Sequence, residues 1–196
     1  MRSQSLHTLF LDAVKEQRAS AGSIATNKLV AAQTEFADDV DVLNYALTLE
    51  HLESAFYKLA PDYSLGDDPF GNSIDEWVGI IGGHEDAHVE TLAAVITDLG
   101  GEPVEAAEYD FGVTDAASFL ATAAILEGVG VSAYDGAAQF IENPDLLLAA
   151  GGIVAVEARH AAYLNLVIGD SPFPAAFETT MTPDEVLEAA GPFFVP

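Results

Sequence analysis

Four glutamates and two histidines are spaced along the chain in a pattern that could bind two metal ions. The order is a lone glutamate, a Glu-x-x-His pair, a second lone glutamate and a second pair: Glu50, Glu85, His88, Glu127, Glu157 and His160. A glutamate and a histidine three positions apart lie on one face of a helix and can reach the same centre. Carboxylate and imidazole ligands suit iron, manganese and zinc, and bridging carboxylates suit a di-metal centre. We therefore predict two metal ions per chain, with iron favoured and manganese as the alternative.

The assignment of ligands to ions follows the two halves of the pattern. One ion would be bound by Glu50 and His88, and the other by Glu127 and His160. The remaining glutamates, Glu85 and Glu157, would bridge the two ions. Six ligands leave coordination positions open for dioxygen or peroxide, which redox chemistry at a metal requires.

The two halves of the pattern repeat each other beyond the metal ligands. Each lone glutamate is followed seven residues later by a tyrosine, Tyr57 or Tyr134. A helical side chain leans back toward the helix N-terminus. We predict that each tyrosine donates a hydrogen bond to a ligand carboxylate, the alternative being simple packing in the core. The repeat also favours Glu50 over Glu53 as the ligand, because Gly130 occupies the position equivalent to Glu53.

Glutamate and histidine residues can also be ordinary surface or packing residues. A lone glutamate in an acidic chain is usually solvent-exposed. Glu50 and Glu127, however, lie among leucine, isoleucine, valine and phenylalanine residues, where a carboxylate must have a partner or be protonated. His51 and His84 adjoin ligand positions but point about 100° away around the helix. We interpret both as surface or packing residues.

The residues around the motifs predict four long helices. Capping and stop signals place them at about residues 39–59, 73–99, 115–141 and 144–168. Short links join the first two and the last two, so each pair forms an antiparallel hairpin. Residues 100–113 lack helical periodicity and could extend to ~46 Å, against ~39 Å for the second helix. This link can therefore cross the bundle from end to end, as in ferritin-like folds.

The predicted fold is all-α, a ferritin-like four-helix bundle with one long crossover between the second and third helices. The bundle is expected at residues 38–170. Residues 1–37 form an N-terminal extension with a short amphipathic helix, and residues 171–196 form a C-terminal segment with a short helix near residues 182–190. The N-terminal helix could dock on the bundle or contact another copy in a homo-oligomer, or it could belong to a partly ordered tail.

Composition excludes several classes of function. The chain has 32 acidic residues against 6 Lys plus Arg, a formal net charge of −26. It cannot assemble the basic face that nucleic acid binding needs. There is no cysteine, so no disulfide or thiolate site can form. No uncharged apolar run reaches the ~18 residues of a membrane span. The acidic excess indicates adaptation to a strongly saline milieu, the alternative being an ordinary acidic protein.

The motifs resemble the ferritin-like di-metal superfamily, which includes ferritins, bacterioferritins and rubrerythrins. The stretches LNYALTLEHLE (residues 43–53) and VEARHAAYL (residues 156–164) are similar to its "ferritin-like domain" branch, which includes desiccation-related proteins and is common in salt-loving microbes. The resemblance implies that the six residues are di-iron ligands. Relatives are often exported, but Asp12 interrupts the N-terminal apolar run and no twin arginine is present. We expect a cytoplasmic protein.

The function expected from the ligands and the resemblance is oxidation of Fe(II) by dioxygen or peroxide, in iron handling or oxidative-stress defence. Such a ferroxidase would be an oxidoreductase. One alternative is a structural, surface or stress protein in which the metal site only stabilises the bundle. Another is an activity like that of manganese catalase.

Overall fold

The structure, a computed structural model, describes residues 36–195. Five α-helices and three short 3-10 helices form this part of the chain, in the order α2, η1, α3, α4, η2, α5, α6 and η3. Within it the only β-structure is two isolated bridges. The all-α prediction is confirmed. The predicted amphipathic helix near the N-terminus lies outside the described residues.

Four long helices form the bundle: α2 (Asp39–Tyr57), α3 (Ile74–Asp98), α4 (Ala116–Ala137) and α5 (Pro144–Val167). They match the predicted ranges, although α2 and α4 end earlier and continue as 3-10 turns, η1 (Ala60–Asp62) and η2 (Ala138–Phe140). The residues that start each helix are those the sequence indicated. Ser73 accepts a hydrogen bond from the Glu76 backbone N–H, and Pro144 occupies the first turn of α5 behind Asn143.

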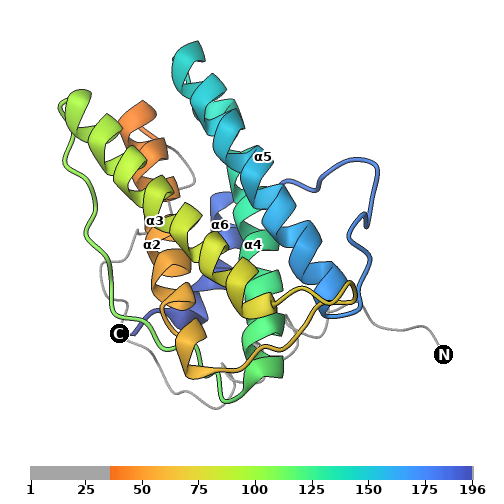
Figure 1. Cartoon of the computed structure of the whole chain (residues 1–196). Coiled ribbons are helices and arrows are strands. Elements are labelled where there is room, and N and C mark those ends of the chain that lie inside the picture. The colour runs from red at the N-terminus through yellow and green to blue at the C-terminus, as the bar shows by residue number, and fades with distance from the viewer. Residues whose placement is uncertain (1–35, 196) are drawn as a thin grey trace.

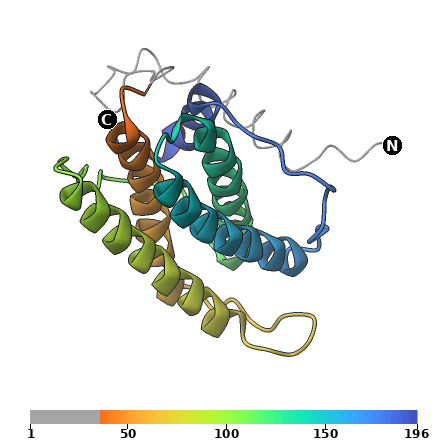
Figure 2. The same ribbon diagram turned by 90° about the horizontal axis from the view of Figure 1, so that it is seen from above.

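The helices pair as two hairpins that meet through α2 and α4. Helix α3 packs mainly on α2, and α5 mainly on α4. Figures 1 and 2 show α3 and α5 on one side of the bundle, diverging toward the end where α5 begins. The only buried residues of α5 are Glu157, His160 and Leu164. Helix α5 therefore buries little besides two of the predicted ligands.

The link between α3 and α4 runs the length of the bundle, as predicted for a single crossover (Figure 1). It is attached to α2 by three hydrogen bonds. The Asn44 amide donates to Glu102 O and accepts from Val104 N, and His51 Nε2 lies 3.1 Å from Val104 O. His51 is thus a packing residue, which is one of the two alternatives that the sequence left open.

The C-terminal segment returns to α4 and closes the side of the bundle formed by that helix. Helix α6 (Pro183–Ala190) begins with a complete capping box formed by Thr182 and Glu185 and is followed by η3 (Gly191–Phe193). Met181 N donates to Ser132 O of α4. A Cβ added at Gly136 would stand 1.9 Å from Met181 O, so only glycine allows the backbones to approach this closely.

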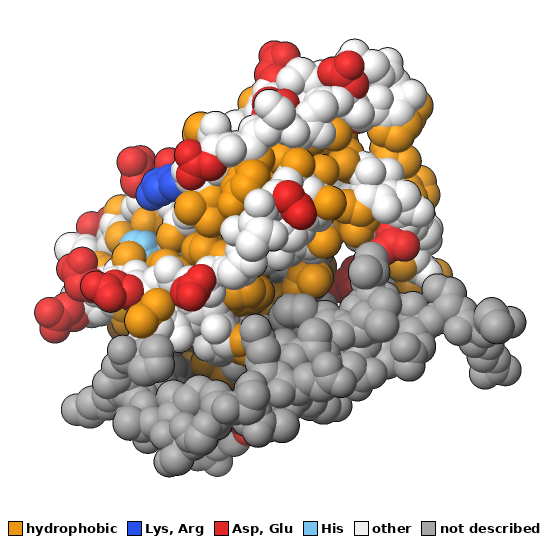
Figure 3. Space-filling model, turned by 90° about the horizontal axis from the view of Figure 1, so that it is seen from below, with side chains coloured by type: hydrophobic (Ala, Val, Ile, Leu, Met, Phe, Trp, Pro, Cys, Tyr) orange, Lys and Arg blue, Asp and Glu red, His pale blue; other side chains and the backbone are white. Residues whose placement is uncertain are grey.

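The surface reflects the composition. In Figure 3 acidic side chains surround a broad apolar area, and basic atoms appear in one small patch. Helices α4 and α5 are long and apolar enough to pass a composition test for a membrane span. One or two such helices are weak evidence. The apolar window of α4 is 56% buried, as in the core helix of a soluble protein, whereas that of α5 is 11% buried. Both helices carry buried ionisable residues at the predicted site.

Candidate metal centre

The structure brings all six predicted ligands together in the interior of the bundle. Glu50 lies on α2, Glu85 and His88 on α3, Glu127 on α4, and Glu157 and His160 on α5. The four glutamates are fully buried, and the His160 residue is 5% exposed. The side chain of His88 is slightly more open, at 12%. Four helices therefore each contribute to one enclosed polar cluster.

Two overlapping groups within this cluster have ligand atoms close enough to share an ion. The first consists of Glu50, Glu85, His88 and Glu157, and the second of Glu85, Glu127, Glu157 and His160. In each group the atoms lie within 4.8 Å of one another. Glu85 and Glu157 belong to both groups. This is the arrangement in which those two glutamates would bridge a pair of ions and each lone glutamate would serve one.

The distances around the two histidines show the internal symmetry of the cluster. His88 Nδ1 lies 3.3 Å from Glu50 Oε2, and 3.0 Å from both Glu85 Oε2 and Glu157 Oε1. His160 Nδ1 lies 3.1 Å from Glu85 Oε1, 3.2 Å from Glu127 Oε2 and 3.9 Å from Glu157 Oε2. Each imidazole thus faces three carboxylates, one from its own helix and two from the others.

Hydrogen bonds from the two tyrosines cross between the halves of the bundle. The Tyr57 hydroxyl of α2 donates to Glu127 Oε1 of α4, and the Tyr134 hydroxyl of α4 donates to Glu50 Oε1 of α2. The predicted contact with a ligand carboxylate is present, and the carboxylate belongs to the opposite half. Each lone glutamate is thereby held at one oxygen and keeps the other oxygen turned toward a histidine.

Burial and proximity shift the pKa values in opposite directions within the cluster. Burial raises the pKa of Glu50 to about 8 and holds that of Glu127 well above its usual range. Burial alone would also raise the pKa of Glu85, but hydrogen bonds from His160 and His88 outweigh it and lower this pKa to about 2. In the metal-free protein, Glu85 is therefore the carboxylate that the two imidazoles compensate.

The pKa values of both histidines are raised by the neighbouring carboxylates. Burial alone would lower the pKa of His88, but hydrogen bonds to Glu157, Glu50 and Glu85 raise it to about 12. For His160, hydrogen bonds to Glu127 and Glu85 likewise outweigh burial and raise the pKa to about 10. Protonated imidazoles supply positive charge to the metal-free cluster, so a cation that binds there must displace protons.

The carboxylates keep unsatisfied oxygens, which tests whether a metal would fit. Within the described part of the chain, four buried carboxylate oxygens accept no hydrogen bond of good geometry: Glu50 Oε2, Glu85 Oε1, and both oxygens of Glu157. Three of them share the two imidazole Nδ1 atoms at 3.0–3.3 Å, and Glu157 Oε2 is 3.9 Å from His160 Nδ1. Buried polar atoms are rarely left unpaired. Two divalent cations would balance the four negative charges and give these oxygens ligands, so the donor set fits a di-metal centre.

Two further residues at the cluster were not recognised as part of it from the sequence. Glu53 is 3% exposed, and burial beside Glu157 and Glu127 raises its pKa well above the usual range. It belongs to neither group of four, in keeping with the repeat. Its carboxylate occupies the space beside Gly130, where an added Cβ would stand 2.9 Å from Glu53 Oε1.

His84 is the second of these residues. Its side chain is exposed, as the sequence indicated, but its Nδ1 also lies 2.9 Å from His160 Nε2, and the two rings stack with centroids 5.2 Å apart. His84 can therefore orient the imidazole whose other nitrogen faces the carboxylates. The contact joins residues far apart in the chain, and no spacing in the sequence signals it.

Comparison with known proteins agrees with this geometry. The family described as "Ferritin-like domain" matches residues 38–170, more than half of the chain. The chain belongs to the ferritin-like domain family. Its four-helix core with a single crossover and a central Glu/His cluster is the arrangement expected of such a member.

A solved structure shows the same fold. The crystal structure of a conserved hypothetical protein, rv2844, from Mycobacterium tuberculosis superimposes with a TM-score of 0.57 at 23% sequence identity, covering 69% of this chain and 94% of that one. At this identity the similarity concerns the fold alone. No curated protein matches the chain.

Proposed function

We propose that this ferritin-like protein holds two iron ions between Glu50, Glu85, His88, Glu127, Glu157 and His160, and oxidises Fe(II) with dioxygen or peroxide. The observation that supports this most directly is the pair of overlapping groups that share Glu85 and Glu157. Two Fe(II) ions held side by side could supply two electrons to one oxidant molecule. The physiological role would be iron handling or defence against oxidative stress.

The chain's own residues would prepare the site for that chemistry. Tyr57 and Tyr134 fix the lone glutamates by hydrogen bonds, which limits their movement when a metal changes oxidation state. Apolar side chains around the cluster keep water from competing with the oxidant. Manganese suits the same oxygen and nitrogen donors, so an activity like that of manganese catalase is the alternative for a di-manganese form.

A structural role is the second candidate, and one specific observation favours it. Helix α5 buries only Glu157, His160 and Leu164, while α3 packs mainly on α2. Ions shared by Glu85 and Glu157 would tie these two helices together across the bundle. A site of this kind could stabilise the fold without any turnover.

Metal content and oxygen consumption distinguish these candidates. Protein purified in high salt should contain about two metal ions per chain, and Fe(II) added to metal-free protein should be oxidised faster than in buffer. Glu85→Ala removes a carboxylate shared by both groups and should lower metal content and abolish the oxidation. Glu90→Ala, at an exposed position of α3, is the control. If the wild type binds iron but consumes no oxygen above the buffer rate, the oxidase proposal fails and the structural role takes its place.

A further inference from the structure

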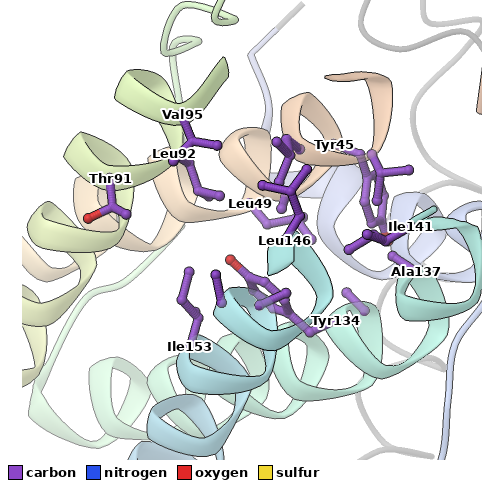
Figure 4. Close-up of a pocket in the computed structure, with 16 residues that line it drawn as sticks. Tyr45, Leu49, Thr91, Leu92, Val95, Tyr134, Ala137, Ile141, Leu146 and Ile153 are labelled. Carbon is purple, nitrogen blue, oxygen red and sulfur yellow. The ribbon is translucent and has the colours of Figure 1, made fainter. Parts of the chain in front are cut away.

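A cavity of about 100 Å³ lies beside the candidate metal centre and is lined by residues of the four long helices. It is drawn in Figure 4. Several of its lining residues are separated by one helical turn from proposed ligands. Leu92 follows His88 by four positions, and Ile153 precedes Glu157 by four. The cavity is thus stacked on the polar cluster along the bundle.

The side chain of Tyr134 contacts both the cavity and the candidate metal centre. Tyr134 lines the cavity, and its hydroxyl donates the hydrogen bond to Glu50. In Figure 4 its ring lies across the cavity, with the hydroxyl directed away from Ala137. A molecule in the cavity would therefore touch a residue that positions a proposed metal ligand.

The lining excludes ions. The residues around the cavity are almost all aliphatic or aromatic, and none of those described carries a charge. Hydrated Fe(II) would lose its water there without gaining any ligand. Apolar cavities of this kind in proteins take up small apolar molecules: an engineered cavity of about 150 Å³ binds benzene.

One polar atom at the cavity lacks a partner. Tyr45 is 4% exposed and lines the cavity, and its hydroxyl has no hydrogen-bond partner among the described residues. Burying a hydroxyl without a partner is unfavourable. A ligand that carries one acceptor oxygen would satisfy it.

The cavity can be reached from solvent between α3 and α5. Thr91 of α3 and Ala149 of α5 both line it and are both exposed. These helices diverge at this end of the bundle (Figure 1). A small molecule could enter here without unfolding either hairpin.

We propose that this cavity is a binding site for a small neutral molecule with a hydrocarbon body of about four to six non-hydrogen atoms and at most one acceptor oxygen, such as a ketone or an ether. The site goes beyond the proposed iron chemistry, and its occupancy does not depend on turnover. Its position next to Tyr134 makes such a molecule a neighbour of the metal centre.

Three probes built on a five-membered carbon ring test the chemical class in the full chain. Cyclopentanone has an acceptor oxygen, methylcyclopentane has none, and cyclopentanecarboxylate carries a charge. Backbone amide NMR titrations should show saturable shifts at lining residues with the two neutral probes and none with the carboxylate. Absence of saturable shifts with both neutral probes would overturn the proposal, and equal binding of the carboxylate would overturn the predicted class.

Variants on one helix locate the site. Ala150→Leu places extra volume in the cavity lining and should abolish binding, whereas Ala155→Leu, at an exposed position of α5 outside the lining, should leave it unchanged. If Ala150→Leu does not fold, Ala149→Leu provides the same test at an exposed lining position. Unchanged affinity in a folded filling variant would refute the location.

The tyrosine is tested separately. Tyr45→Phe removes the donor and should weaken cyclopentanone about 2- to 10-fold with little effect on methylcyclopentane. Equal effects on the two probes would show that Tyr45 does not recognise the ligand through its hydroxyl.

Discussion

Replacing Glu50 by glutamine should change the stability of the metal-free and metal-loaded proteins in opposite directions. The side chain is fully buried, and burial raises the pKa of Glu50 from 4.5 to about 8. At pH 7 the metal-free protein must therefore protonate a group that is ionised in the unfolded chain. Glutamine has nearly the same shape, needs no proton and can still accept the hydrogen bond from Tyr134.

The size of the effect follows from the two pKa values. A carboxyl whose pKa is raised by folding costs no stability below the unfolded value of 4.5. Its cost grows as the pH rises toward 8, at about 1.4 kcal/mol per pH unit. At pH 7 the cost is about 3 kcal/mol, provided that the folded pKa exceeds 7. For a chain of this size, that corresponds to a rise in Tm of about 6–12 °C in the metal-free variant.

The metal-loaded proteins should show the reverse order. Ligand binding at a concentration 100 times Kd stabilises the folded state by about 2.7 kcal/mol per site. The variant loses one ligand oxygen and should lose part or all of this gain. The assay is calorimetry with chelator and with saturating Fe(II) under nitrogen, at pH 5 and pH 7. The difference between the metal-free proteins should be much smaller at pH 5.

A control separates the local effect from the overall charge. Removing one negative charge from a chain of net charge −26 relieves general repulsion wherever the charge lies. Glu90→Gln, at an exposed position of α3, measures that contribution. Two results would refute the reasoning. The first is a metal-free Glu50→Gln protein that melts no higher than Glu90→Gln at pH 7, and the second is a loaded variant that keeps the full stabilisation by metal.

Further predictions concern salt, packing and protons. Thermal melts in KCl should show Tm rising from 0.1 to 3 M, because the Debye length shrinks from ~10 Å at 0.1 M to ~3 Å at 1 M; an unchanged midpoint would contradict the interpretation as a salt-adapted protein. Gly128→Ala, where an added Cβ meets nothing within 4 Å, should stabilise α4 by up to about 1 kcal/mol. Gly130→Ala should stabilise the protein less, because its Cβ would press on Glu53. Equal stabilisation by the two variants would exclude that contact. Loading with Zn²⁺ at pH 7 should release protons into weakly buffered solution, since the pKa values of His88 and His160 are raised to about 12 and about 10; loading without proton release would contradict protonated imidazoles.

Much of the fold could be predicted because its signals are local. Proline, glycine and capping residues mark the helix ends, and these act within a few residues of each other. The crossover was predicted from length alone, since 14 residues can span a helix of this size. The helix ends themselves were less certain: α2 and α4 tighten into 3-10 turns at η1 and η2, which hydrophobic spacing does not reveal.

The convergence of the six candidate ligands could be predicted because the repeat fixes their register. A Glu-x-x-His pair has one face, so Glu85 with His88 and Glu157 with His160 had to point inward together or not at all. Contacts between the halves were beyond this reasoning. Tyr57 reaches Glu127 across the bundle, and His84 reaches His160, because the relative placement of two hairpins is set by packing and not by spacing within either one.

The departure from the repeat at Glu53 and Gly130 shows why the symmetry of the cluster must be incomplete. An exact repeat would place a second glutamate at position 130, facing Glu53 across a space where even a Cβ would lie 2.9 Å from Glu53 Oε1. Two divalent ions at the candidate metal centre would balance four glutamates, so Glu53 already adds a fifth buried carboxyl, and a sixth would remain uncompensated. Burial beside Glu157 keeps the pKa of Glu53 well above its usual range, so this carboxyl can stay protonated and neutral. Glycine at position 130 thus avoids both a steric conflict and a further buried carboxyl, and it makes the two halves of the candidate metal centre chemically different.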